Sequence, residues 1–121
     1  MIAIGSDHGG FELKGHIIEH LKEKGIEVKD FGTYSEASVD YPDCAKPVCK
    51  AVLDGECECG ILICGTGIGI SMAANKFKGI RAALCGDVFS AKMSKEHNNA
   101  NIICMGGRVL GRELANMIVD T

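Results

Sequence analysis

The chain has 121 residues, of which 46% are hydrophobic, and a formal net charge of −3 at neutral pH. This length suits one domain, residues 1–121, which buries about two thirds of the surface of its unfolded chain. The negative charge and the absence of tryptophan disfavour nucleic acid and anionic membranes as partners. Seven cysteines, with neither an export signal nor an apolar run of membrane length, indicate reduced thiols and a cytoplasmic protein.

Short apolar runs alternate with helical patterns along the chain, which is typical of a parallel sheet covered by helices. Five strands are predicted: Ile2 to Ser6, Glu27 to Phe31, a run that ends at Cys64, Ala82 to Cys85, and Ile102 to Met105. Helices are predicted over Phe11 to Lys24, over Asp40 to Leu53, over Ile70 to Asn75, from about Val88, and from about Gly111. The pattern therefore predicts an α/β fold without repeats or linkers.

The most informative segment runs from Cys59 to Asn75 and joins an apolar strand to a glycine-rich turn. Cys64 stands at the carboxyl end of the strand. The turn that follows allows backbone N–H groups to approach a ligand closely, because every second residue is a glycine: Gly65, Gly67 and Gly69. A helix comes next, and its amino end favours negative charge. A thiol beside an anion-binding turn is therefore predicted at the edge of the sheet where α/β proteins bind ligands.

Other loops also carry chemical groups. They are Ser6 to Gly10 after the first strand, Gly86 and Asp87 after the fourth, Gly106 to Arg108 after the fifth, and His97 with Asn98 after the fourth helix. We expect all these loops to converge with the glycine turn. An acid, two histidines, a thiol, an amide and a guanidinium gathered in this way suit proton transfer on a polar, anionic small molecule.

Seven motifs span nearly the whole chain. They are I-A-I-G-S-D-H-G-G from Ile2, D-Y-P-D from Asp40, C-G-T-G-I-G from Cys64, A-A-N-K from Ala73, G-I-R-A from Gly79, E-H-N-N-A-N from Glu96 and G-G-R-V from Gly106. In kind and order they resemble the motifs of type B ribose-5-phosphate isomerases, within the wider family that includes galactose-6-phosphate and allose-6-phosphate isomerases. The resemblance implies a three-layer α/β/α sandwich with a Rossmann-like five-stranded parallel sheet, in which the second strand is followed by the first, third, fifth and fourth.

The resemblance also implies an activity and an assembly. The activity is a metal-independent interconversion of ribose 5-phosphate and ribulose 5-phosphate that needs no cofactor. The expected assembly is a homodimer or homotetramer with active sites at the subunit interface. Galactose 6-phosphate and allose 6-phosphate remain alternative substrates, because the residues that measure the length of the sugar cannot be identified from spacing.

The same resemblance assigns roles to residues. Cys64 would move a proton between neighbouring carbons through an enediolate, and His97 would open the sugar ring. The substrate contacts would be Asp7, His8, Tyr41, Gly65, Thr66, Gly67, Ile68, Gly69, Asn98 and Arg108. The residue types fit these roles, because a helix amino end favours a thiolate and a planar guanidinium suits phosphate oxygens.

One feature departs from the family pattern. Its members usually continue beyond the last predicted helix into a segment with further arginines, whereas the sequence here ends at Thr121. This difference bears on phosphate binding and on dimer stability, but leaves the proton-transfer residues in place. Arg112 is a candidate to compensate.

The site residues also fit other classes of protein in part. Gly65 and Gly67 with Asp87 downstream partly match a dinucleotide-binding motif, but the third glycine comes one residue early and the chain lacks a substrate domain. A non-catalytic module that binds a sugar phosphate or a nucleotide is the remaining alternative. No metal site is predicted, because the pairs Cys57 with Cys59 and His16 with His20 lack further ligands at suitable spacing.

Overall fold

A computed structural model describes the backbone of residues 1–32 and 41–121, and the side chains of residues 1–32 and 44–121. Its strands are β1 (Ile2–Ser6), β2 (Val28–Asp30), β3 (Cys59–Cys64), β4 (Ala82–Leu84) and β5 (Ile102–Gly106). Its helices are α1 (Phe11–Glu23), α2 (Tyr41–Leu53), α3 (Ile68–Ala74), α4 (Val88–Glu96) and α5 (Arg112–Asp120). These elements match the predicted ones to within two residues at most ends. The largest difference at a start is α3, which begins at Ile68 instead of Ile70.

The strands form one parallel sheet in the order β2-β1-β3-β5-β4, which confirms the predicted order. The register places Ser6 of β1 opposite Ile63 of β3, and Cys64 of β3 opposite Gly106 of β5. Strands β1, β3 and β5 therefore end side by side. Because the strands are parallel, the loops that follow them lie at one edge of the sheet.

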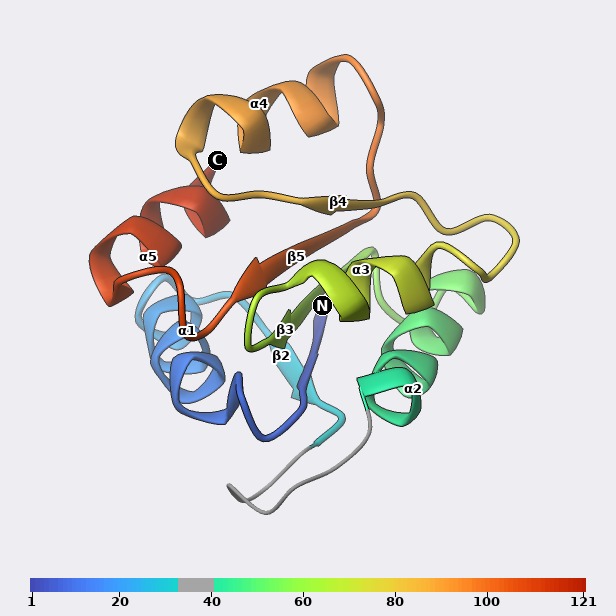
Figure 1. The fold of residues 1–121 in the computed structure, drawn as a ribbon, viewed down its shortest axis with the longest axis horizontal. Helices are drawn as coiled ribbons and strands as arrows, with labels where there is room; N and C mark the ends of the chain where they lie inside the picture. Colours follow the sequence, from blue (N-terminus) through green and yellow to red (C-terminus); the bar gives the residue numbers. More distant parts are fainter. Residues whose placement is uncertain (33–40) are drawn as a thin grey trace.

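Helices cover both faces of the sheet, with α1 and α5 on one side and α2 and α3 on the other (Figure 1). Each layer encloses its own apolar core. One core includes Val48 of α2, Leu62 of β3 and Ile70 of α3, and the other includes Ile17 of α1, Ile63 of β3 and Ile118 of α5. Side chains of β3 alternate between the two cores, as expected of a central strand buried on both faces. The fold is the predicted three-layer, Rossmann-like α/β/α sandwich.

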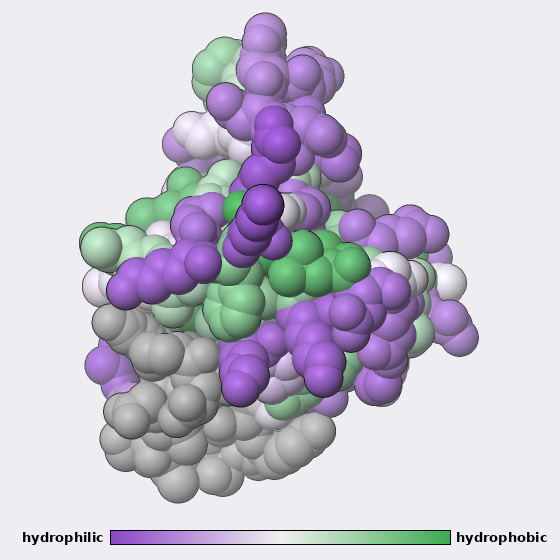
Figure 2. Space-filling view, turned by 90° about the vertical axis from the view of Figure 1, so that its right-hand side faces the viewer, coloured by the Kyte–Doolittle hydropathy of each residue, from purple (hydrophilic) through white to green (hydrophobic). Residues whose placement is uncertain are grey.

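The surface on the side of α2 and α3 is mixed, with a hydrophobic area flanked by hydrophilic residues (Figure 2). Within residues 1–32 and 41–121, none of the helices has the length and apolar character needed to cross a bilayer.

Candidate active site

Cys64 is the last residue of β3 and is 5% exposed. The backbone N–H of Gly67 donates to its Sγ at 3.1 Å. Gly67 has a φ of +83°, and a Cβ there would lie 2.5 Å from Cδ1 of Leu84 and 2.8 Å from the carbonyl carbon of Met105. Only glycine fits such a backbone conformation and such close neighbours. The glycine turn predicted from the sequence therefore bends back on the thiol and points an N–H at it.

Arg108 is held against this turn by the loop after β5. The N–H of Gly107 donates to the carbonyl oxygen of Cys64 at 2.7 Å, and the N–H of Arg108 donates to that of Gly65 at 3.0 Å. The Arg108 side chain lies over Gly65, since a Cβ on that glycine would be 3.5 Å from Cδ of the arginine and 3.7 Å from its Nη1. An exposed guanidinium thus stands beside the turn that follows the thiol.

Asp7 shapes the loop after β1. Its N–H donates to the carbonyl oxygen of Ile63 at 3.1 Å, which ties the loop to β3. Its Oδ1 accepts the N–H groups of Gly9 at 2.9 Å and Gly10 at 3.2 Å. The carboxylate is largely buried and stabilises the turn that carries His8. The structure therefore shows that Asp7 stabilises the loop after β1.

A polar recess of about 270 Å³ opens between the loops after β1 and β5. Its lining consists of His8, Gly9, Glu12, Gly107 and Arg108. The loops touch at glycines, because a Cβ on Gly107 would lie 2.6 Å from the carbonyl oxygen of Gly9. An imidazole and a guanidinium facing one small recess suit an anion such as phosphate. Glu12 was missed by the sequence prediction, because it lies on α1 and a glutamate in the first turn of a helix is normally explained by the helix dipole alone.

The remaining predicted contacts of the turn take different places. Oγ1 of Thr66 accepts the N–H of Ile68 at 3.2 Å, so this hydroxyl stabilises the turn itself. Ile68 and Gly69 lie in the first turn of α3, and the Ile68 side chain is exposed. Tyr41 begins α2, but its side chain lies outside the described residues.

His97 and Asn98 are not near Cys64, so the expected convergence of all the loops within one chain is wrong. They follow α4, which runs antiparallel to the strands, so they lie at the opposite, amino edge of the sheet. Nε of Arg81, just before β4, donates to the carbonyl oxygen of Asn98 at 3.2 Å. From Ile102, at this edge, β5 runs to Gly106, which pairs with Cys64, so its length of about 13 Å separates the two edges.

Other thiols of the core are kept protonated by their surroundings. Burial raises the pKa of Cys49 to about 11 and also raises the pKa of Cys85 and Cys104. Among the described side chains, no three histidine, cysteine, aspartate or glutamate residues lie close enough together to hold a metal ion. Cys64 differs from the thiols of Cys49, Cys85 and Cys104 because a backbone N–H, that of Gly67, points at its sulfur.

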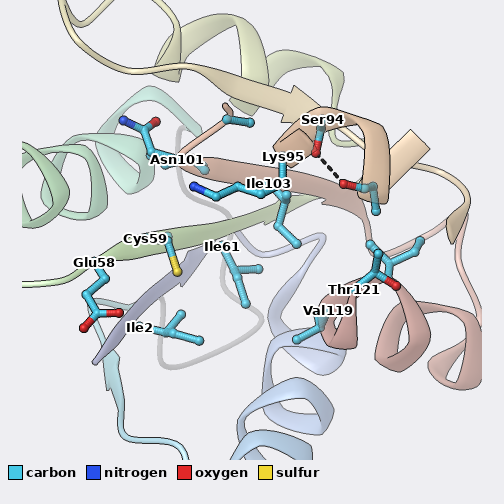
Figure 3. A pocket seen from close by; sticks show the side chains of 15 residues that line it. Ile2, Glu58, Cys59, Ile61, Ser94, Lys95, Asn101, Ile103, Val119 and Thr121 are labelled. Carbon is cyan, nitrogen blue, oxygen red and sulfur yellow. Dashed lines mark hydrogen bonds between the residues drawn. The ribbon is translucent and has the colours of Figure 1, made fainter. Parts of the chain in front are cut away.

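A second cavity, of about 330 Å³, lies at the amino edge of the sheet, between the sheet and the helices α4 and α5 (Figure 3). Its lining is largely apolar and includes Ile2, Ile61, Ile103 and Val119. None of the side chains predicted to contact substrate lines it. A polar, anionic ligand is better served by the recess at Arg108.

The chain matches a family model described as Ribose/Galactose Isomerase over residues 2–121. The chain belongs to this family. It is 56% identical over 119 residues to a protein named ribose-5-phosphate isomerase B of Escherichia coli (strain K12). The aligned region covers 98% of this chain and 80% of that protein. It is 48% identical over 120 residues to galactose-6-phosphate isomerase subunit LacB of Clostridium acetobutylicum. This aligned region covers 99% of this chain and 69% of that subunit.

Solved structures of the ribose/galactose isomerase family share the fold. The solved structure of ribose-5-phosphate isomerase B from Clostridium thermocellum superposes on this chain with a TM-score of 0.97 and 59% sequence identity, over 98% of this chain and 80% of that one. The sequence resemblance to this family is therefore confirmed along the whole chain.

Proposed function

We propose that this protein is an aldose–ketose isomerase that interconverts ribose 5-phosphate and ribulose 5-phosphate. One observation carries the proposal: the Cys64 thiol accepts a backbone N–H on its sulfur, and the next residue, Gly65, lies under the Arg108 side chain, which lines a polar recess together with His8. The relatives named ribose-5-phosphate isomerase B support this choice of substrate.

Cys64 acts as the base. Its thiolate removes the proton from the carbon next to the carbonyl, and the bond electrons move onto the carbonyl oxygen to give an enediolate. Backbone N–H groups of the turn from Gly65 to Gly69 stabilise the negative oxygen as charge develops on it. The hydroxyl proton on the neighbouring oxygen moves to the former carbonyl oxygen, and the Cys64 thiol returns its proton to the former carbonyl carbon. The electrons left on the second oxygen form the new carbonyl, which completes the exchange of carbonyl and hydroxyl positions. Neither a metal nor a cofactor takes part.

Arg108 and His8 hold the phosphate in the recess that they line. The planar guanidinium offers two parallel N–H donors to phosphate oxygens, and the imidazole adds a third donor. Asp7, Tyr41 and Thr66 contact the sugar, and Asn98 does so from the second copy of the chain that also supplies His97. Glu12, at the rim of the same recess, adds a negative charge that favours a substrate whose hydroxyl groups reach it.

His97 opens the sugar ring, and it comes from a second copy of the chain. Within one chain it lies at the wrong edge of the sheet for Cys64. An apolar patch formed by Ile68, Met72 and Leu84 adjoins the Cys64 turn, and these side chains are 52%, 63% and 44% exposed. Strand β4 next to it pairs only with β5 among the described strands. Apolar side chains on an edge strand favour burial against a partner, so a homodimer with the site at its interface is proposed.

The proposal is tested by conversion of ribose 5-phosphate to ribulose 5-phosphate with the purified protein. Cys64→Ala is expected to lower kcat by at least about a hundredfold, because a positioned base contributes that much or more. Cys59→Ala is the matched control, since this half-buried thiol lies at the other end of the same strand, and it keeps wild-type turnover. Added chelator changes nothing. Full turnover in Cys64→Ala would remove it as the base.

A hexose phosphate is the second candidate, favoured by the relative named galactose-6-phosphate isomerase subunit. Measuring kcat/KM for ribose 5-phosphate, galactose 6-phosphate and allose 6-phosphate side by side decides between them. A nucleotide is less well supported. Asp87, the acidic residue of the partial dinucleotide motif, accepts hydrogen bonds from the N–H and the hydroxyl of Ser90 and so caps α4. It follows β4, and β5 lies between β4 and the strand that leads into the glycine turn, β3. Binding of ribose 5-phosphate without any turnover would instead indicate a sugar-phosphate sensor.

A further inference from the structure

Lys14 is an unusual member of the core. It lies on the buried face of α1 and is 2% exposed. Its ammonium donates to both carboxylate oxygens of Asp30, at 2.8 Å and 2.9 Å. It also lies 5.4 Å from the centroid of the Phe11 ring, within range of a cation–π contact. The charge is therefore satisfied, but by partners that must be held in place.

Such a pair is not needed for packing. Removing an ammonium and a carboxylate from water costs free energy, and well-packed apolar residues of similar volume often serve stability as well or better. Methionine at Lys14 together with an uncharged residue at Asp30 would fill the same space without this cost. The ion pair is therefore better explained by the geometry that it imposes on its surroundings.

One branch of the contacts leads to the start of the loop after β1. Oδ1 of Asp30 accepts the N–H of Gly32 at 2.9 Å, in addition to the ammonium of Lys14. The carbonyl oxygen of Gly32 in turn accepts the N–H of Ser6 at 3.0 Å. Ser6 directly precedes Asp7. The ion pair thus fixes the residue from which the loop departs.

The other branch leads to the end of the same loop. The backbone N–H of Lys14 donates to the carbonyl oxygen of Gly10 at 2.9 Å, and the N–H of Gly10 donates to that of Asp7 at 3.2 Å. Lys14 is therefore linked to both ends of the segment from Ser6 to Gly10. Cys64 and Arg108 are held to each other by the hydrogen bonds between the loops after β3 and β5, so their positions do not depend on the contacts of Lys14.

We propose that the ion pair of Lys14 and Asp30 positions the loop from Ser6 to Gly10, and through it sets the place of His8 opposite Arg108. This inference rests on the proposed function, in which this loop binds the sugar phosphate. The pair acts through the loop and touches no reacting atom. It controls substrate affinity, while the proton transfer at Cys64 is independent of it.

Lys14→Met tests the role of the charge, because methionine keeps most of the side-chain volume. It is expected to raise KM for ribose 5-phosphate about tenfold, with kcat within about twofold of wild type, as for loss of a binding interaction. Leu21→Ala is the control. It removes a buried side chain near the other end of the same helix, so it lowers the unfolding temperature but leaves KM unchanged. A wild-type KM in Lys14→Met, or a rise matched by Leu21→Ala, would overturn the proposal.

Asp30→Asn is the second variant, and it decides the matter if Lys14→Met does not fold. Its amide oxygen still accepts the N–H of Gly32, but the charge is gone. A smaller rise in KM, about threefold, is expected. An unchanged KM in folded Asp30→Asn would contradict the proposal.

Amide hydrogen exchange gives a measure that needs no turnover. In the ligand-free protein, Lys14→Met is expected to speed exchange of the Ser6 and Gly32 amides about tenfold relative to the Gly60 amide, because opening of the loop becomes easier. Leu21→Ala leaves this ratio unchanged. If the wild type isomerises no sugar phosphate, the proposed function fails, while this ratio still tests the positioning role. An unaltered ratio in Lys14→Met would refute it.

Discussion

At the residue scale, Gly67 joins the conformation of the turn to the chemistry of the thiol. Its positive φ and its close approach to Leu84 and Met105 leave no room for a side chain. Its N–H is also the group that contacts Sγ of Cys64. A change at this residue should therefore act on stability and on turnover together.

Gly67→Ala is expected to lower the free energy of unfolding by about 2 to 4 kcal/mol, from backbone strain and a forced shift of neighbours, and to reduce kcat strongly. Denaturant unfolding and the isomerase assay measure the two effects. Gly111→Ala is the control, since a Cβ there meets nothing within 4 Å and its φ is −75°. Wild-type stability and turnover in Gly67→Ala would show that the turn adapts.

Residue types that stand out in a sequence were the ones that could be predicted. A cysteine followed by alternating glycines needs no structure to attract notice, and Arg108 and His8 were found in the same way. Lys14 was missed because a lysine in an amphipathic helix is normally assigned to the solvent side. Its partner, Asp30, lies 16 residues away on another element, and nothing local in the sequence links them.

At the element scale, a small ionic cluster joins α1 to α5. Oδ1 of Asp120 lies 2.8 Å from Nε2 of His20 and 2.9 Å from Nζ of Lys24. Partial burial would raise the pKa of Asp120, but the hydrogen bonds and charges of Lys24 and His20 outweigh it and lower that pKa. A carboxylate in the last turn of a helix is unfavourable towards the helix dipole, and the ammonium of Lys24 and the hydrogen bond with His20 offset this cost.

Asp120→Asn therefore tests a pH-dependent contribution to stability. A lowered pKa in the folded state stabilises above the pH at which an unfolded aspartate titrates, and the gain is lost as the pH falls through the folded pKa. The substitution is expected to cost about 0.2 to 1 kcal/mol at pH 7, with the difference fading as the pH falls below about 4, where an unfolded aspartate titrates. Thermal unfolding across this range measures it. Asp54→Asn, an exposed carboxylate after α2, gives the baseline, and an Asp120→Asn difference independent of pH would argue against the pairing.

The elements and the order of the strands were predicted correctly, but the position of one loop was not. The strands stand out because a central parallel strand is apolar on both faces, as in Ile61, Leu62 and Ile63. The error concerned His97 and Asn98. A loop after a strand and a loop after a helix lie at opposite edges of a parallel sheet, so the segment after α4 could not join the others. Applying this rule to the predicted order of elements would have placed His97 correctly without a structure.

At the scale of the whole molecule, the separation of Cys64 from His97 requires two chains for one complete active site. If both residues serve one reaction, each active site must combine Cys64 of one chain with His97 of its partner. In a two-fold dimer the exchange is reciprocal, so two identical sites form. The exposed Ile68, Met72 and Leu84, beside the Cys64 turn, provide an apolar surface where such a partner fits.

Mixing two inactive variants tests this arrangement. Cys64→Ala and His97→Asn each spoil both sites of their own dimers, by removing the base and the ring opener respectively. In a mixed dimer, the His97→Asn chain supplies an intact Cys64 and the Cys64→Ala chain supplies an intact His97, so one of two sites is whole. Random exchange at equal amounts makes about half of the dimers mixed, so about one quarter of wild-type turnover should return. Unfolding and refolding the variants together, against the same treatment of each alone, measures the recovery. If Cys64 and His97 of the same chain served one site, every site in the mixture would lack one of them, and no activity would return.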